Sequence, residues 1–147
     1  MKIFIGADHR GFELKEFLKK ELKRMGGEIK DLGNLKYDPL DDFPDFAFPV
    51  AKAVKGNNGS LGILLCGSGV GVSIAANRVK GIRAVLGFNK DQVEKARQHD
   101  HCNILCLPAD YVDKSFALEL AKTFLSTKPE NKEKYLRRIK KLDLDIK

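Results

Sequence analysis

The chain of 147 residues is long enough for one domain, residues 1–147, and its 43% hydrophobic and 32% charged residues are typical of a soluble globular protein. No apolar stretch approaches a membrane span, and the N-terminal run KIFIGA is too short for a signal peptide, so we expect no membrane role. Three cysteines, an odd number, favour a reducing cytoplasm over a disulfide framework. The net charge of +7 lacks a stripe of aromatic residues, which argues against nucleic acid and for attraction of small phosphate esters.

The apolar pattern predicts strands that alternate with helices along the whole chain. We predict strands at residues 2–7, 28–32, 62–66, 83–87 and 103–107. We predict helices at residues 12–25, 45–54, 72–78, 90–98, 114–126 and 130–142, with Pro49 either kinking the second helix or marking its start. Regular alternation is typical of a doubly wound α/β sheet, in which ligands bind beyond the carboxyl ends of the strands.

The segment of residues 61–78, LGILLCGSGVGVSIAANR, predicts a buried strand that runs through a glycine-rich turn into a helix. Gly67, Gly69 and Gly71 leave little side-chain bulk, so the N–H groups of the turn can approach a ligand closely. Free N–H groups at the start of a helix attract anions. Cys66 ends the strand beside this positive field, which favours the thiolate as a base or nucleophile. The alternative is a buried, inert cysteine ahead of an ordinary tight turn.

Several common glycine-loop motifs do not match this turn. A Walker loop needs a lysine after its glycines, and a dinucleotide fingerprint needs a third glycine where this chain has Val72. A phosphate-binding cysteine loop needs an arginine at that same position. A nucleophile elbow needs a glycine where Cys66 stands. The remaining interpretation is an anion-binding loop with a thiol and the Ser68 hydroxyl at its mouth.

Further polar residues follow the first predicted strand. Asp8 and His9 should therefore meet Cys66 and Ser68 at the carboxyl edge of the sheet. His99 ends a helix and precedes the fifth strand, which puts it at the opposite edge of its own subunit. If His99 works at this site, it comes from a neighbouring subunit. Asp8 could instead cap the following helix, and His9 could be a solvated loop residue.

Four possible metal ligands lie near the fifth predicted strand: His99, His101, Cys102 and Cys106. Their spacing matches no recognised zinc site. We therefore expect Cys102 and Cys106 to fill the core around that strand, and we expect no metal or other cofactor.

Four segments together resemble one family closely: GADHRGFELK near the N-terminus, LLCGSGVGVSIAANR in the middle, GIRA at 81–84 and ARQH at 96–99. Over nearly its whole length the chain is similar to the type B ribose-5-phosphate isomerases and the related galactose-6-phosphate isomerase subunits. The resemblance implies a Rossmann-like three-layer αβα sandwich with a five-stranded parallel sheet and C-terminal helices. It also implies a homodimer or homotetramer with active sites between subunits, and metal-free aldose–ketose isomerisation of a sugar phosphate through an enediolate.

The resemblance also implies roles for individual residues. Cys66 is implied as the base that moves a proton between C1 and C2, with Ser68 assisting proton movement at the oxygens. Asp8 and His99 are implied to open the sugar ring. The residues implied to hold the enediolate oxygen are Gly67, Gly69, Val70 and Gly71. The residues implied to line the rest of the substrate site are His9, Asp100, Lys134 and Arg138, of which His9 and Arg138 bind the phosphate.

Five residues depart from the family pattern: Phe43, Asp100, Asp110, Lys134 and Tyr135. Phe43 stands where tyrosine usually precedes proline, and Asp100 stands where asparagine usually follows the catalytic histidine. Asp110 replaces an arginine that commonly contacts phosphate, and Lys134 with Tyr135 replaces an Arg-His pair. If the aspartates face the pocket, we expect ribose 5-phosphate to be a poor substrate and another sugar phosphate to be better; the alternative is that Asp110 points to solvent.

Three functions from different classes remain open. The first is an isomerase of a phosphorylated pentose or hexose, and the second is a non-catalytic sugar-phosphate or nucleotide binding module that keeps the glycine-rich turn. The third is a thiol hydrolase that uses Cys66 as its nucleophile. Exchange at C2 of aldose phosphates in heavy water, with ketose formation, would indicate the first.

Overall fold

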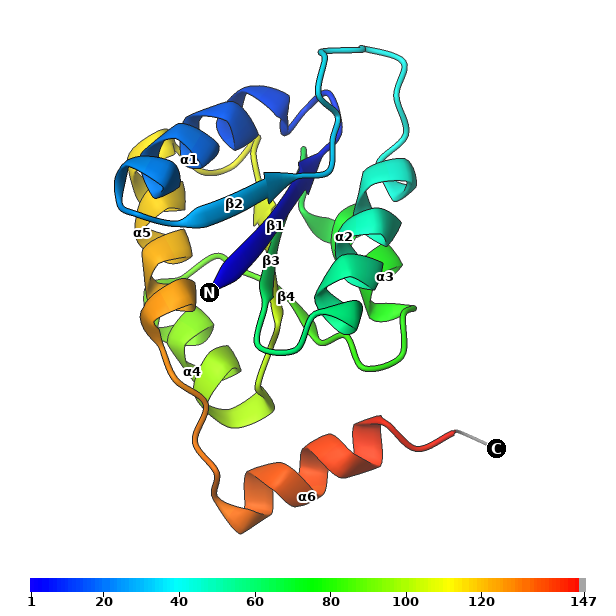
Figure 1. The fold of residues 1–147 in the computed structure, drawn as a ribbon, viewed down its shortest axis with the longest axis vertical. Helices are drawn as coiled ribbons and strands as arrows, with labels where there is room; N and C mark the ends of the chain where they lie inside the picture. Colours follow the sequence, from blue (N-terminus) through cyan, green and yellow to red (C-terminus); the bar gives the residue numbers. More distant parts are fainter. Residues whose placement is uncertain (146–147) are drawn as a thin grey trace.

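The structure, a computed structural model, describes residues 1–145 of the chain. Its elements in chain order are β1 (Lys2–Ala7), α1 (Phe12–Arg24), β2 (Glu28–Asp31), α2 (Pro44–Gly56), β3 (Leu61–Cys66), α3 (Val70–Asn77), β4 (Ala84–Leu86), α4 (Lys90–Asp100), β5 (Ile104–Pro108), α5 (Lys114–Ser126) and α6 (Glu133–Leu142). The strands form one five-stranded sheet in the order β2-β1-β3-β5-β4, with every pair parallel (Figure 1). The predicted three-layer α/β fold with a parallel sheet is confirmed.

Each face of the sheet carries its own hydrophobic core. Helices α1, α4 and α5 cover one face, and α2 and α3 cover the other (Figure 1). Strand β3 lies in the middle of the sheet and is buried along its whole length, because helices cover both of its faces. Successive side chains alternate between the two cores, so Leu65 packs in the α1–α4–α5 core and Cys66 packs in the α2–α3 core.

The predicted element boundaries differ from the structure in a few places. α2 begins at Pro44, and Pro49 lies inside that helix rather than at its start. α6 begins at Glu133, later than predicted, because the backbone N–H of Glu130 donates to the carbonyl of Gln98 at 2.9 Å and ties this segment to α4. Within residues 1–145, no helix combines the length and apolar character that a membrane span requires.

The chain direction changes at the centre of the sheet, between β1 and β3. The connection after β1 enters α1 on one face, and the connection after β3 enters α3 on the other face (Figure 1). In doubly wound folds the loops at such a point separate and leave room for a ligand. The loop of residues 32–43 arches above the same edge of the sheet. The topology therefore assigns the ligand site to the carboxyl ends of β1 and β3.

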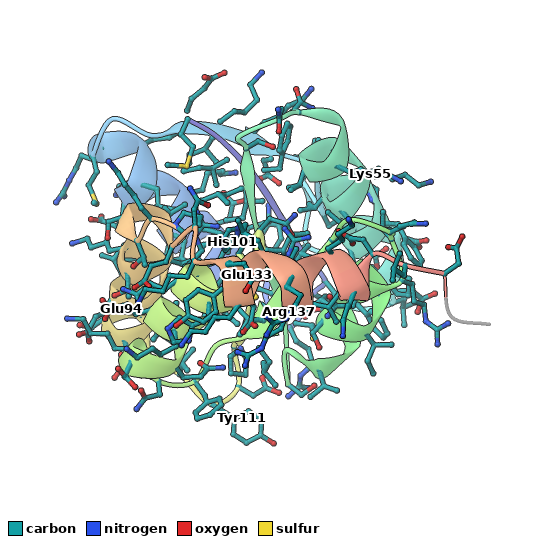
Figure 2. All side chains as sticks on the ribbon, turned by 90° about the horizontal axis from the view of Figure 1, so that it is seen from below. Lys55, Glu94, His101, Tyr111, Glu133 and Arg137 are labelled. Carbon is teal, nitrogen blue, oxygen red and sulfur yellow. The ribbon has the colours of Figure 1, made fainter. Side chains whose placement is uncertain are left out.

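Helix α6 lies outside the two helical layers, beneath the amino edge of the sheet (Figure 1). Figure 2 views the protein from that side and shows Glu133 and Arg137 on α6 as it crosses the body. The Tyr135 ring is the buried part of this helix and stacks on the His99 ring, with centroids 4.4 Å apart. Leu136 and Leu142 remain 44% and 65% exposed. α6 thus presents apolar side chains outward from its own subunit.

Candidate active site

Backbone hydrogen bonds beyond the ends of three strands hold the loops of the site side by side. The N–H of Asp8 donates to the carbonyl of Leu65 at 3.3 Å. The N–H of Ala109 donates to the carbonyl of Cys66 at 2.9 Å, and the N–H of Asp110 donates to the carbonyl of Gly67 at 3.0 Å. These bonds extend the ladders between neighbouring strands, so the residues that follow β1, β3 and β5 meet at one edge.

The glycine loop, residues 67–71, turns back on the end of β3. Gly69 has φ 72°, a left-handed conformation that side chains rarely adopt, and it immediately precedes α3. A Cβ at Gly69 would lie 3.1 Å from the backbone of Leu107 and Pro108, so the turn also packs tightly on β5. This turn points the N–H of Gly69 at the sulfur of Cys66, with N and Sγ 3.2 Å apart. The Ser68 hydroxyl is exposed beside it and accepts the N–H of Val70 at 3.2 Å.

The three thiols of the chain have different surroundings. Cys66 is 4% exposed, and its sulfur accepts the N–H of Gly69 just ahead of α3. Burial raises the pKa of Cys102 to about 12, and it also raises the pKa of Cys106, which is 0% exposed. The prediction that Cys102 and Cys106 fill the core is confirmed, and Cys66 differs from them in lying at the carboxyl end of β3 against the glycine loop.

Asp8 lies beside the glycine loop at the end of β1 and is 6% exposed. Its Oδ1 accepts the N–H groups of Arg10 at 3.0 Å and Gly11 at 3.1 Å, just ahead of α1. The alternative that Asp8 caps α1 is wrong, because the N-cap of α1 is Gly11, which has no side-chain capping bond, and Asp8 instead holds the turn ahead of it. Burial raises the pKa of Asp8, with the N–H of Gly11 acting in the opposite direction. A carboxyl group in this state exchanges protons closer to neutral pH than an exposed aspartate does.

His9 is paired with a carboxylate that the sequence analysis missed. The His9 ring Nδ1 lies 2.7 Å from Asp41 Oδ1, and the His9 backbone N–H donates to the same oxygen at 2.9 Å. Asn34 donates to the other oxygen of Asp41 at 3.2 Å. The bond to Asp41 raises the pKa of His9, so the imidazolium is favoured. Asp41 lies in the loop of residues 32–43, where the sequence offered only an irregular run of Pro and Asp.

Within residues 1–145, the structure brings together one group of three side chains with metal-ligand chemistry. Asp8, His9 and Asp41 offer ligand atoms that all lie within 4.8 Å of one another. Each of these residues is already engaged, because Asp8 holds two backbone N–H groups and His9 holds Asp41. These hydrogen bonds explain why the three side chains lie together: they belong to an ion pair and a turn just ahead of α1.

Arg10 and Asp110 form a second ion pair, which lies against Gly67 of the glycine loop. Arg10 Nε and Nη2 lie 2.9 and 2.5 Å from Asp110 Oδ2. A Cβ at Gly67 would lie 2.6 Å from this carboxylate oxygen and 2.7 Å from Arg10 Nε, so the ion pair packs directly on Gly67. Asp110 therefore lies against the glycine loop and is paired with Arg10, whereas the sequence left open whether it faced the pocket or the solvent. Phe43 packs its ring on Gly71, where a Cβ would approach it to 2.9 Å.

The remaining predicted site residues lie at the opposite edge of the sheet. His99 is near the end of α4, where its ring stacks on Tyr135. The other three, all exposed, are Asp100 at the end of α4 and Lys134 and Arg138 on α6. The prediction that His99 lies far from Cys66 in its own subunit is confirmed. Within one chain, the structure assembles Asp8, His9, Cys66, Ser68 and the glycine loop without these four residues.

Comparisons with known proteins identify the family of this chain. The sequence model of the family described as Ribose/Galactose Isomerase matches residues 3–142. A relative from Mycoplasma pneumoniae, named probable ribose-5-phosphate isomerase B, is 44% identical over 128 residues, which are 87% of this chain and 84% of the relative.

Two solved structures of similar sequence share the fold. A ribose 5-phosphate isomerase from Thermotoga maritima aligns with a TM-score of 0.92 and 43% identity, covering 97% of each chain. Ribose-5-phosphate isomerase B from Mycoplasma genitalium, solved with bound ribulose-5-phosphate, aligns with a TM-score of 0.90 and 42% identity, covering 97% of this chain and 93% of that one. Because the family match spans nearly the whole chain and the relatives share its fold, the chain belongs to the ribose/galactose isomerase family.

Proposed function

We propose that this protein is an aldose–ketose isomerase that interconverts ribose 5-phosphate and ribulose 5-phosphate. Family membership supports the reaction class, and the relatives named as ribose-5-phosphate isomerases support the substrate. The observation that carries the proposal is the Gly69 N–H directed at Cys66 Sγ, at the start of a helix and beside Asp8. This arrangement combines a potential base with donors suited to an oxyanion.

The proposed reaction moves one proton between two carbons. The Cys66 thiolate removes the proton from C2 of the open-chain aldose and returns it to C1, while the Ser68 hydroxyl transfers a proton between the two oxygens. The intermediate is an enediolate, whose negative oxygen is stabilised by N–H groups of the glycine loop other than those of Gly69 and Val70, which already bond to Cys66 Sγ and Ser68 Oγ. Asp8, whose pKa is raised by burial, acts as the acid and base that opens the sugar ring. No step needs a metal or cofactor.

The proposal of ribose 5-phosphate as the substrate replaces the expectation from the sequence that this sugar phosphate would be a poor substrate. That expectation assumed that the carboxylate of Asp110 would face a phosphate dianion without compensation. Its partner Arg10 offsets this charge, and the charged form of His9 adds a second cation in the loop after β1. Repulsion by Asp110 therefore no longer argues against a pentose phosphate.

We further propose that a second copy of the chain completes each site. Strand β3 has six residues and spans about 20 Å, so His99 at the amino edge cannot reach Cys66 at the carboxyl edge of its own subunit. Lys134 and Arg138 lie on α6, whose exposed Leu136 and Leu142 offer an apolar surface for a partner. His99, Lys134 and Arg138 of one subunit would then act beside Cys66 of another.

The central test is the activity of Cys66→Ala. Loss of about 10²–10⁴-fold in kcat with an unchanged thermal midpoint is expected, because this is the usual contribution of a positioned base. Cys102→Ala is the matched control, since it makes the same change at the other end of the sheet, and it should retain near-normal kcat. Incubation with ribose 5-phosphate in heavy water should give deuterium exchange at C2 in the wild type. Near-normal turnover by Cys66→Ala would exclude Cys66 as the base.

Subunit mixing tests the shared site. Inactive Cys66→Ala and inactive His99→Ala proteins, after verified exchange of subunits, should together recover part of the wild-type activity. A monomer at working concentration, or no recovery in the mixture, would contradict the shared arrangement.

We also propose that the protein works in the reducing cytoplasm. All three cysteines are unpaired and buried, and the proposed mechanism requires the free thiol of Cys66.

A further inference from the structure

We propose that Arg10 binds the phosphate group of the substrate and that Asp110 is the positioning residue that holds its guanidinium over the glycine loop. The inference rests on the proposed function and adds a specificity-determining residue to the same site. It concerns an ion pair between two residues that lie 100 positions apart in the chain and meet at the carboxyl edge of the sheet.

The geometry leaves one edge of the Arg10 guanidinium, the edge that carries Nη1, able to bind a ligand. Arg10 Nε and Nη2 both donate to one oxygen, Oδ2 of Asp110, so the carboxylate occupies a single edge of the planar group. Within residues 1–145, Nη1 of Arg10 donates to no protein group, and the side chain is 58% exposed. An arginine presents two such edges, and either can bind a carboxylate or phosphate through two parallel N–H bonds.

The location fits the charged end of a small substrate. Arg10 lies against Gly67 of the glycine loop, and the preceding residue, His9, pairs with Asp41. A sugar phosphate with its reacting carbons at Cys66 extends only a few atoms before its phosphate. The charged group therefore falls within the rim of the site, where Arg10 and His9 are the cations contributed by the loop after β1. The hydrogen bond from Arg10 to Asp110 raises the pKa of Arg10, so its charge is constant at any working pH.

Asp110 has a definite role in this arrangement rather than being a source of repulsion. A long, exposed arginine loses rotamer freedom when it binds a ligand, and this loss weakens binding. Asp110 is itself held by its backbone bond to Gly67, so its carboxylate restricts Arg10 before the substrate arrives. The negative charge of Asp110 is offset by the guanidinium that it positions.

The first experiment compares KM for ribose 5-phosphate among single variants. Arg10→Met keeps most of the side-chain length and should raise KM about 10- to 100-fold, as expected for loss of hydrogen bonds to a charged group, with kcat within about threefold of wild type. Arg10→Lys should recover only part of this loss, because an ammonium cannot bind both groups in the same geometry. Arg24→Met, which removes an exposed arginine from the end of α1, is the control and should leave KM unchanged. An unchanged KM in Arg10→Met would overturn the proposal.

A double-mutant cycle tests the role of Asp110. Asp110→Asn in the wild-type background should raise KM about 2- to 10-fold, because Arg10 becomes free to move. The same substitution in Arg10→Met should lower KM, because it then removes an uncompensated carboxylate near the phosphate. A change of sign between backgrounds is expected only if Asp110 acts through Arg10. The same direction in both backgrounds would show that Asp110 does not position Arg10.

Calorimetric binding of ribose 5-phosphate separates this inference from the proposed function. Weak or absent binding by Arg10→Met beside firm binding by the wild type supports the role of Arg10 even if the wild type proves not to isomerise the sugar. Equal binding by wild type and Arg10→Met overturns the role of Arg10 while leaving the isomerase proposal intact. No measurable binding by the wild type would overturn both.

Discussion

The left-handed glycine at the start of α3 allows a quantitative test of how the glycine loop is held. Gly69 and Gly59 have similar backbone conformations, with φ of 72° and 80°. A Cβ added at Gly59 meets no atom within 4 Å, whereas one added at Gly69 meets the backbone of β5. Replacing each glycine by alanine therefore introduces the same conformational strain in two different surroundings.

The expected magnitudes follow from these surroundings. The strain of a left-handed alanine costs about 1–2 kcal/mol, and we expect this loss in Gly59→Ala. At Gly69 the new methyl group would lie 2.5 Å from Leu86 Cδ1 and 3.1 Å from the backbone of Leu107 and Pro108. The leucine side chain can move, but the backbone atoms belong to β5, and overpacking of this kind costs about 1–3 kcal/mol more. Gly69→Ala should therefore lose about 2–5 kcal/mol of unfolding free energy.

Urea unfolding, with the same m value in both variants, measures the unfolding free energies of Gly59→Ala and Gly69→Ala. The kcat of each variant shows whether the glycine loop still functions. Gly59→Ala should retain normal kcat, because it lies between α2 and β3 at the amino edge. Gly69→Ala should lose activity in the remaining folded protein, because a shifted loop moves the N–H away from Cys66 Sγ. Equal destabilisation by the two substitutions would refute the claim that β5 packs against the turn.

Two further predictions concern protonation at the site. Asp41→Asn should lower the pKa of His9 in an NMR titration, because the bond to Asp41 raises that pKa. The charged His9–Asp41 pair stabilises the fold fully below about pH 6.5, and this stabilisation is lost as the pH rises through the folded pKa of His9. It is also lost at acidic pH, where Asp41 is protonated. The variant should thus differ in stability from the wild type most between about pH 4 and 6.5, and a difference that grows above pH 8 would contradict this assignment. Iodoacetamide should modify Cys66 in the native protein, with protection by ribose 5-phosphate, while Cys102 and Cys106 should react only after unfolding because burial raises the pKa of both. Mass spectrometry of the peptides checks this, and labelling of Cys106 in the folded protein would contradict it.

The elements that could be predicted from sequence are those set by local pattern. The strand β3 can be recognised from its own continuous apolar run, because a strand that helices cover on both faces has no polar face. Placing Cys66 at the carboxyl end of that strand then follows from chain direction. The same reasoning placed His99 at the opposite edge, because a helix returns the chain to the amino end before the next parallel strand begins.

The ion pairs of the site could not be predicted in this way, because they join residues that are distant in sequence. His9 meets Asp41 across 32 positions, and Arg10 meets Asp110 across 100 positions. Neither pair has a spacing that a helix or strand would reveal. The effect of Asp110 on substrate choice could not be judged from the sequence for the same reason, since Arg10, the partner that compensates its charge, lies far from it in the chain.

The two pairs also explain how the site holds positive charge without being strongly basic. His9 is held by Asp41, and Arg10 is held by Asp110 against Gly67 of the glycine loop. Each carboxylate orients a cation before the substrate binds, so little reorganisation accompanies binding or the formation of an enediolate.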